Sequence, residues 1–371
     1  MTTSPLPPIR IPVYRPDLSG NEKAYVNQCL DTTWISSRGE FIERFQRGFA
    51  QRIGAADALA VCNGTVAIHL PLVALGVGPG DEVIVPSLTY VAAVNAIRYV
   101  GATPVFADSD LRTWQVDPAD VEARITPRTK AILAVHLYGQ ACDMTALCAL
   151  ARRKGLLVVE DCAEAFGTKI GDQHVGTFGD AASFSFFGNK TITTGEGGMV
   201  VMRDPAAHRL ALKLRGQGLA DTREYWHDVV GYNYRMTNIC AAIGFAQLER
   251  ADQFLARKRA IAEQLATQLA GLPLSVHGEA PGTTHSYWMI SVATDDAAQR
   301  DPLRHALRLA GIETRPLFHP VHTMPMYAAD QTGLARAIDL GQRGINLPSW
   351  PGMSDEEVRS IADAIRAHFR R

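Results

Sequence analysis

The sequence predicts an α/β fold with a mainly parallel sheet wrapped by helices. Strand patterns and helix patterns alternate between residues 82 and 161, which is the rhythm of β-α-β units. One of these strands contains the aliphatic run Leu156–Val159, which indicates a strand buried on both faces. A second apolar run, residues 183–187, ends in Gly188 and Asn189 and leads into a polar turn rich in glycine.

Two helices are expected before this alternation. Ser19 and Glu22 have the spacing of a capping box, which predicts a helix that runs to about Asp31. The next helix ends at Gly54 and has an apolar face. Three phenylalanines at every fourth residue form that face: Phe41, Phe45 and Phe49.

A short strand, Ala58–Val61, follows and runs into the turn Asn63-Gly64. Thr65 is expected to begin a helix there. The free amides and the dipole at a helix start can bind a phosphate group, and the Thr65 hydroxyl could add a bond. Such a turn is most often only a turn, so the phosphate hypothesis depends on the rest of the site. Pro71 lies about two turns into this helix and predicts a kink.

The alternation itself consists of strands that are separated by helices. The expected strands are Glu82–Val85, Thr103–Ala107, Lys130–Val135 and Leu156–Glu160. The expected helices are Tyr90–Val100, a helix with Asp117 as N-cap and Pro118 at its first position, and Asp143–Lys154. Because a ligand in an open α/β sheet binds at the carboxyl ends of the strands, Asp161 lies where a site is expected.

The chain after the glycine-rich turn is expected to complete a large domain and build a smaller one. A strand at Met199–Met202 and a helix at Ala206–Leu214 are followed by a long helical stretch from Thr237 to about Ala270. The rest is a mixed α/β segment, with a closing helix after the N-cap Ser354. The predicted domains are residues 1–250 and residues 251–371.

Size and composition are those of a soluble globular protein of two domains. The 371 residues are 47% hydrophobic and 20% charged. Lys and Arg number 37 against 38 Asp and Glu, so no charge excess favours nucleic acid or an anionic membrane. No apolar run reaches the roughly 20 residues of a membrane span, and no apolar signal core is visible, so a cytoplasmic location is expected. The six cysteines include no C-x-x-C pair, which argues against a zinc site.

Lys190 is the first candidate for chemistry. Most lysines are solvated surface charges. Here an apolar run precedes the lysine and would bury its stem, while Gly195, Gly197 and Gly198 are expected to let backbone approach a ligand. A desolvated lysine has a lowered pKa and becomes a nucleophilic amine that forms Schiff bases with carbonyl compounds.

Asp161 is the second candidate. A carboxylate at the end of a buried strand needs a cationic partner. Pyridoxal phosphate (PLP) satisfies both residues, because its aldehyde takes the lysine and its ring nitrogen is kept protonated by an aspartate. The two residues together therefore favour a PLP site.

The two segments E-D-C-A-E-A at Glu160 and S-F-S-F-F-G-N-K-T-I-T-T-G-E-G-G at Ser183 resemble the fold-type I PLP enzymes. Within them, the chain is similar to the nucleotide-sugar aminotransferases of the DegT/DnrJ family, from W-I-S-S at Trp34 to N-L-P at Asn346. The resemblance implies the fold-type I fold, with a large domain on a mainly parallel mixed sheet and a smaller C-terminal α/β domain. It also implies a homodimer.

The resemblance assigns cofactor contacts beyond Lys190 and Asp161. Gly64 and Thr65 would bind the phosphate, and Tyr90 would stack on the pyridine ring. Glu164 stands where many relatives carry Gln near the ring's phenolic oxygen, and Ser185 is a further contact. Asn233, in the N-x-R element, would reach across a dimer interface to the partner's cofactor phosphate; Asn238 is a second candidate for that role. His136 could equally be a core histidine and is not assigned to catalysis.

Substrate contacts are also expected from the resemblance. They are Trp34, Ser36, Ser37, Arg215, Arg315, His319 and His322. Arg315, His319 and His322 raise the question of a metal. Only two histidines are close together and no carboxylate completes a ligand set, so no metal site is predicted.

The predicted function is amination of a nucleotide-linked keto sugar, with glutamate as the amino donor. A GDP sugar is favoured, with GDP-4-keto-6-deoxymannose converted to GDP-perosamine. Other acceptors, a dTDP or UDP sugar or amination at carbon 3, stay open. Relatives that dehydrate sugars replace the Schiff-base lysine with histidine, so a dehydratase is less favoured. A non-catalytic binding or regulatory protein on the same fold is the remaining alternative.

Overall fold

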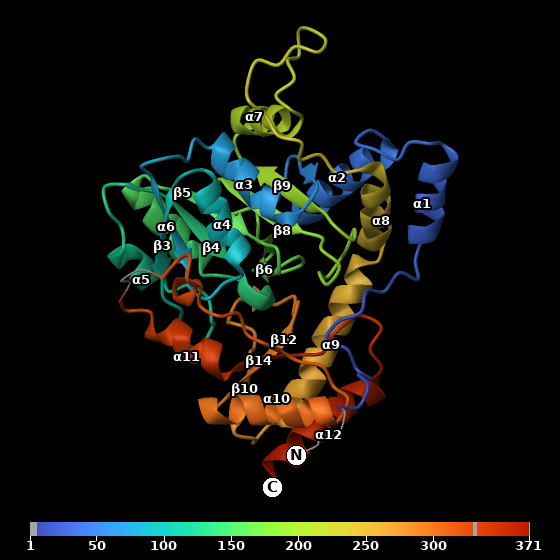
Figure 1. The fold of residues 1–371 in the computed structure, drawn as a ribbon, viewed down its shortest axis with the longest axis vertical. Helices are drawn as coiled ribbons and strands as arrows, with labels where there is room; N and C mark the ends of the chain where they lie inside the picture. Colours follow the sequence, from blue (N-terminus) through green and yellow to red (C-terminus); the bar gives the residue numbers. More distant parts are fainter. Residues whose placement is uncertain (1–5, 329–331, 371) are drawn as a thin grey trace.

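The computed structural model describes residues 6–328 and 332–370 and is built around a seven-stranded sheet with the order β1-β9-β8-β5-β4-β2-β3 (Figure 1). The five strands from β8 to β3 pair in parallel, whereas β9 is antiparallel to both β8 and β1. This is the mainly parallel mixed sheet that the sequence predicts. The strands are β1 (Leu59–Val61), β2 (Glu82–Pro86), β3 (Thr103–Ala107), β4 (Thr129–Val135), β5 (Leu157–Asp161), β8 (Ala181–Ser185) and β9 (Gly198–Met202).

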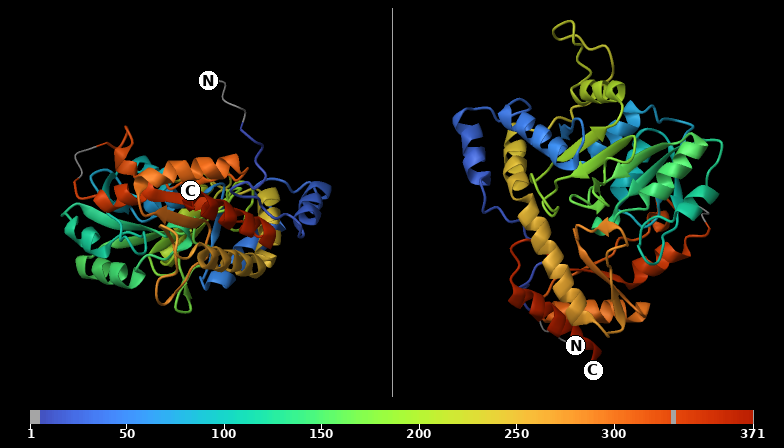
Figure 2. Two further views of the ribbon diagram at one scale, coloured as in Figure 1. Left: turned by 90° about the horizontal axis from the view of Figure 1, so that it is seen from below. Right: turned by 180° about the vertical axis from the view of Figure 1, so that it is seen from behind.

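Helices surround this sheet, as the alternation predicts (Figures 1 and 2). Side-chain caps define their starts: Asn63, Asp117, Asp143 and Asp204 each accept a hydrogen bond from a first-turn amide. The helices of this part are α2 (Glu40–Ile53), α3 (Gly64–Ala74), α4 (Val91–Tyr99), α5 (Pro118–Ala123), α6 (Met144–Lys154), α7 (Pro205–Arg215) and α8 (Asn238–Glu249). The three phenylalanines of α2 are buried in one core cluster, and Gly54 ends the helix in a left-handed conformation.

Pro71 is buried inside α3 and does not end it. The helix is continuous to Ala74, and the amide of Leu75 still donates to the Pro71 carbonyl oxygen over 2.9 Å. The missing amide of Pro71 therefore removes one hydrogen bond without dividing the helix.

Asp17 explains why the expected Ser19 cap is wrong. Its carboxylate accepts from the Ser19 hydroxyl over 2.6 Å, so Ser19 does not cap α1 (Glu22–Asp31), whose N-cap is Asn21. The same carboxylate binds Arg250 over 3.0 Å. The expected helical stretch is present as α8 and α9 (Ala251–Leu269), which are separated by Arg250 with its non-helical dihedral angles.

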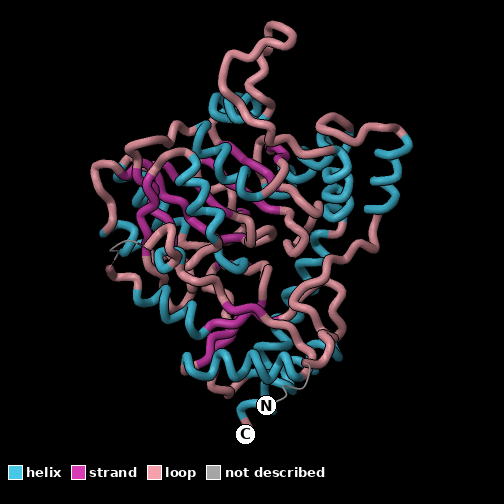
Figure 3. The backbone as a smooth tube through the Cα atoms, viewed as in Figure 1, coloured by secondary structure: helices cyan, strands magenta, loops and turns pink. Residues whose placement is uncertain are grey.

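The C-terminal part forms a second core on an antiparallel sheet, and Figure 3 shows its strands apart from those of the large sheet. The strand order is β10-β12-β14-β13. The strands are β10 (Leu274–Val276), β12 (Ile290–Thr294), β13 (Arg315–Pro316) and β14 (Gly344–Leu347); the helices are α10 (Arg300–Leu309), α11 (Ala335–Arg343) and α12 (Asp355–Phe369). Ile11 belongs to this second core although it lies in the first predicted domain. The boundary at residue 250 stays a prediction.

Three short strands and three 3₁₀ helices complete the described chain. The strands form a small sheet, β11-β6-β7, from Lys169–Ile170 (β6), Gln173–His174 (β7) and Thr283–Thr284 (β11). The 3₁₀ helices are Leu137–Gly139, Ala297–Gln299 and Val321–Thr323. Among the described residues, no helix has both the length and the apolar character needed to cross a membrane.

Candidate active site

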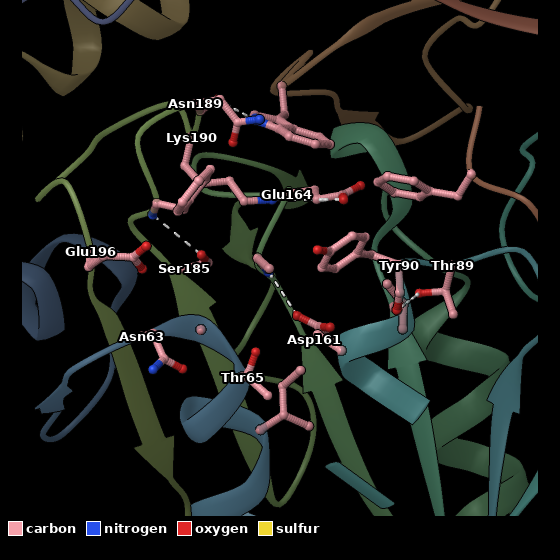
Figure 4. A pocket seen from close by; sticks show the side chains of 18 residues that line it. Asn63, Thr65, Thr89, Tyr90, Asp161, Glu164, Ser185, Asn189, Lys190 and Glu196 are labelled. Atoms are coloured by element: carbon pink, nitrogen blue, oxygen red, sulfur yellow. Dashed lines mark hydrogen bonds and ion pairs between the residues drawn. The ribbon is translucent and has the colours of Figure 1, made fainter. Parts of the chain in front are cut away.

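A cavity of about 280 Å³ lies where β4, β5 and β8 end and α3 and α4 begin (Figure 4). Seven of the predicted site residues line it: Gly64, Thr65, Tyr90, Asp161, Glu164, Ser185 and Lys190. Parallel strands place their carboxyl ends at one edge of a sheet, so residues that are far apart in the sequence meet there. The structure therefore brings the two principal candidates, Lys190 and Asp161, into one cavity.

The Lys190 side chain is 13% exposed and lies in the turn after β8. Its Nζ is 3.8 Å from Oε1 of Glu164 and 3.8 Å from the centroid of the Trp288 ring. Burial lowers the pKa of the amine, and the nearby charges of Glu164 and Asp161 oppose that shift. The amine is thus partly desolvated and held between an aromatic face and a carboxylate, as a nucleophilic lysine requires.

Asp161 is the last residue of β5 and is buried. Its Oδ1 accepts hydrogen bonds from the Ala163 amide over 3.0 Å and from the Ser183 hydroxyl over 3.3 Å. Burial raises the pKa of the carboxyl, because the charged form has lost water. Both of these bonds end on Oδ1, which leaves Oδ2 for a cationic ligand in the cavity.

Glu164 is held by a backbone amide from a strained position. Its Oε2 accepts from the Tyr138 amide over 2.7 Å, and Tyr138 has a φ of 57°, in the left-handed region. Burial raises the pKa of Glu164, whereas the charge of Lys190 opposes the shift. The pKa values of Glu164 and Lys190 therefore move towards each other, and a proton is shared between the two groups more evenly than in water.

The start of α3 forms the expected phosphate cup. The Asn63 side chain caps the Val66 amide over 3.0 Å, and the Asn63 carbonyl accepts from the Ala67 amide. No protein acceptor is described for the amides of Gly64 and Thr65, and both residues line the cavity, where Figure 4 shows the Thr65 side chain. Two free amides, a hydroxyl and a helix dipole suit a phosphate group.

The glycines after Lys190 also allow close packing within the protein. A Cβ at Gly198 would lie 2.6 Å from the Asn63 carbonyl oxygen, and a Cβ at Gly197 would collide with the Thr194 hydroxyl. Gly195 has a φ of +81°. These glycines let β9 lie against the cup and let the loop turn.

The partner-reaching candidates, Asn233 and Asn238, lie outside this cavity. Asn233 is exposed in the segment that follows the projecting loop above α7 in Figure 1. Asn238 is buried; its amide nitrogen donates to the Trp34 carbonyl and its oxygen accepts from the Phe41 amide. Asn238 is therefore a structural residue, and the prediction that it could reach a partner is wrong.

The expected substrate contacts near the N-terminus do not line the cavity either. Trp34, Ser36 and Ser37 lie in the exposed loop between α1 and α2, and the Ser36 carbonyl accepts from the Asn238 amide over 2.6 Å. Arg215 donates to Gln46 and to the Ala60 carbonyl. These bonds give Arg215 a packing role in this chain. No pattern in the sequence around Arg215 indicated those partners.

The C-terminal substrate candidates also lie outside the cavity lining. Arg315 is paired with Glu313 on the exposed side of β13, and His319 is exposed. His322 Nδ1 lies 2.5 Å from the Ser87 hydroxyl. His319 and His322 do, however, follow Phe318, which lines the cavity.

His136, the histidine that was not assigned to catalysis, is a core residue. Its Nδ1 accepts from the Cys142 amide over 3.0 Å and its Nε2 lies 3.1 Å from Glu160. His136 lies with Glu160 and Cys162 in a geometry that could hold a metal. However, both carboxylate oxygens of Glu160 already accept hydrogen bonds, from the amides of Gly176, Phe178 and Gly179. The cluster is therefore explained by hydrogen bonding within the core.

The lining residues that sequence reasoning missed include Trp288, Phe318 and Glu196. Trp288 and Phe318 come from the C-terminal part and form an aromatic wall with Tyr138 and Tyr90. The ring centroids are 6.2 Å apart for Trp288 and Tyr138, and 5.3 Å apart for Phe318 and both tyrosines. Glu196 belongs to the glycine-rich turn, in which no sequence pattern marks it as a cavity residue.

These residues fit PLP. The cavity combines a desolvated amine, a buried carboxylate with one oxygen free, and a helix start with free amides (Figure 4). The amine matches the aldehyde of the cofactor, the carboxylate its ring nitrogen and the helix start its phosphate. Figure 4 shows the three groups on different sides of one space.

Comparison with known proteins agrees with this site. The model of the DegT/DnrJ/EryC1/StrS aminotransferase family matches residues 16–366. The GDP-perosamine synthase of Escherichia coli O157:H7 is 56% identical over 359 residues, which cover 97% of this chain and 98% of the relative. The GDP-perosamine synthase of Vibrio cholerae is 52% identical over 363 residues, 97% of this chain and 99% of the relative.

A solved structure shows the same fold. Spr1654 from Streptococcus pneumoniae, in its PLP form, superimposes with a TM-score of 0.92 at 27% identity over 99% of each chain. The family model covers every residue that lines the cavity. The chain therefore belongs to the DegT/DnrJ/EryC1/StrS aminotransferase family.

Proposed function

We propose that this chain is a PLP-dependent aminotransferase that converts GDP-4-keto-6-deoxymannose to GDP-perosamine, with glutamate as the amino donor. The observation that carries the aminotransferase activity is the amine of Lys190, desolvated between Trp288 and Glu164 in the cavity that also holds Asp161. The sugar is proposed because relatives at 56% and 52% identity, over nearly the whole chain, bear the name GDP-perosamine synthase.

PLP, when bound, supplies an aldehyde that condenses with amines and a ring that delocalises the electron pair left on the donor's α carbon. Lys190 would hold the aldehyde carbon between turnovers. The lowered pKa of Lys190 leaves more of the amine unprotonated, so the freed amine can accept the proton from the donor's α carbon and deliver it to C4′ of the cofactor.

Asp161 and Glu164 set the proton balance around that amine. Asp161 would keep a proton on the ring nitrogen through its free Oδ2, because an ion pair there stabilises the charged form of both groups. The Glu164 carboxyl, fixed by the Tyr138 amide, lies 3.8 Å from the Lys190 Nζ. It can therefore hold a proton near Lys190 while the lysine acts as base.

A homodimer with shared sites is part of the proposal. Among the described residues that line the cavity, Lys190 is the one base and Asp161, Glu164 and Glu196 are acids. A dianionic phosphate in such surroundings gains from further donors, and the exposed Asn233 is a candidate donor from a partner subunit. The loop beside it exposes apolar side chains, with Tyr225 93% and Val230 90% exposed, which favours a partner surface there.

The acceptor is tested with a panel of nucleotide keto sugars and glutamate. We expect GDP-4-keto-6-deoxymannose to be aminated at carbon 4, with one 2-oxoglutarate released per sugar. Its kcat/KM should be at least about tenfold higher than that of dTDP-linked and UDP-linked 4-keto sugars, which corresponds to about 1.4 kcal/mol in transition-state binding. A dTDP or UDP sugar as best acceptor would show that the GDP assignment is wrong. Loss of a hydroxyl without amination would indicate a dehydratase.

Asp161→Asn tests the role of the carboxylate. The variant should still bind PLP but lose more than about tenfold of its kcat, because a neutral amide cannot hold the ring nitrogen protonated. Ser183→Ala is the matched control: it removes the 3.3 Å hydroxyl bond to Oδ1 and keeps the carboxylate. Turnover of Asp161→Asn within about threefold of the wild type would assign the pyridinium contact to another residue.

Shared sites are tested by mixing two inactive variants, Lys190→Ala and Asn233→Ala. Random exchange makes half of the dimers mixed, and each mixed dimer has one site with both residues intact, so activity should return to about a quarter of the wild-type value. Each variant is first shown to be folded, dimeric and inactive alone. If activity stays at zero after exchange, both residues act within one chain and the shared-site model is wrong.

A further inference from the structure

The N-terminal segment, residues 10–14, is bound to the C-terminal core and not to the large sheet. Ile11 is buried there and forms a parallel bridge with Ile312. The Glu313 amide donates to the Ile11 carbonyl over 2.9 Å, and the Val13 amide donates back to the Glu313 carboxylate over 3.1 Å. The Ser349 amide donates to the Val13 carbonyl over 3.2 Å. These bonds fix the segment immediately before Tyr14.

Tyr14 connects this segment to the turn that carries the reactive lysine. Its hydroxyl donates to the carbonyl oxygen of Lys190 over 2.6 Å, although the two residues are 176 positions apart. Burial raises the pKa of the Tyr14 hydroxyl, so it stays protonated and remains a donor. Tyr14 does not line the cavity, and its hydroxyl binds the backbone of Lys190 and not the amine.

A second aromatic residue holds the preceding carbonyl. The Trp288 Nε1 donates to the carbonyl oxygen of Asn189 over 2.7 Å, while the ring of the same residue faces the Lys190 Nζ. The Lys190 backbone amide donates to the carbonyl oxygen of Phe187 over 2.9 Å. Successive carbonyls of the Asn189-Lys190 segment are thus bound by two side chains that pack with the C-terminal part, and the turn has little freedom to rotate.

Lys258 of α9 lies against the ring of Tyr14. Its Nζ lies 5.3 Å from the centroid of the Tyr14 ring and donates to the Ser349 carbonyl and hydroxyl over 3.2 Å each. Lys258 is fully buried, and within residues 6–328 and 332–370 no carboxylate forms an ion pair with it. Burial lowers its pKa to about 7. A buried amine without a counter-charge is costly, which is consistent with a specific task for it beside Tyr14.

We propose that Tyr14 is a positioning residue for the reaction: its hydroxyl fixes the Lys190 peptide so that the amine stays over the Trp288 ring and beside Glu164. The inference rests on the proposed function for its catalytic consequence only. The N-terminal segment is then part of the active-site apparatus, although the reactive lysine lies in the large sheet's half of the molecule. A turn released from Tyr14 would let the amine leave its place.

Tyr14→Phe isolates the hydroxyl, because the ring that faces Lys258 is kept. Amide hydrogen exchange is measured by mass spectrometry for the peptide that spans residues 188–192, with and without added PLP. Loss of one buried hydrogen bond should speed exchange there about five- to tenfold, and kcat should fall by a similar factor while KM for the sugar stays within about twofold. Tyr25→Phe is the matched control, since it removes a tyrosine hydroxyl bond to Glu249 far from the turn.

Trp288→Phe provides a second variant, because it removes the Nε1 donor to Asn189 and keeps an aromatic ring. It should speed exchange in the same peptide. Unchanged exchange of residues 188–192 in both variants, or an equal rise in Tyr25→Phe, would overturn the proposal. The exchange measurement needs no turnover, so a wild-type enzyme that fails to aminate the GDP sugar would refute the proposed function and leave this test intact.

Discussion

The site depends on one constraint: an amine must be removed from water without being locked into a permanent ion pair. Lys190 meets it with a side chain that is 13% exposed and a carboxylate 3.8 Å away, a distance too long for a tight bidentate bridge. Burial lowers the pKa of the amine and raises that of Glu164, and the attraction between the two charges opposes both shifts. A surface lysine with the same neighbours in the sequence would stay protonated and unreactive.

Keeping that balance requires support from distant parts of the chain. Tyr138 supplies an amide to Glu164 from a left-handed backbone conformation, and Trp288 supplies both a ring for the amine and a donor for the preceding carbonyl. Tyr14 adds the bond to Lys190 itself. All three residues pack with the C-terminal half, which also supplies Trp288 and Phe318 to the cavity lining. The large sheet places the reactive groups, and the smaller part restricts their movement.

The parts of the fold that the sequence predicts well are those set by local chemistry. Alternating strands and helices, Asp and Asn caps, and Gly54 and Gly155 at helix ends all depend on residues within a few positions of each other. The position of Asp161 at a strand end and of Lys190 after an apolar run is local in the same sense. The expected Ser19 cap fails because a partner outside the helix decides: the Asp17 carboxylate binds the Ser19 hydroxyl. Trp288, Phe318 and Tyr14 meet the turn only through tertiary packing, and no spacing in the sequence signals such contacts.

The central claim is that Lys190 is the amine that holds PLP, and the most direct measurement is to locate that bond. The protein is incubated with PLP, reduced with borohydride and digested, and the modified peptide is identified by mass spectrometry. The account predicts that the pyridoxyl group is on Lys190 alone, at about one per chain, and that Lys190→Ala gives no stoichiometric label while still folding. A label on another lysine, such as the buried Lys258, or a stoichiometric label in Lys190→Ala, would contradict it.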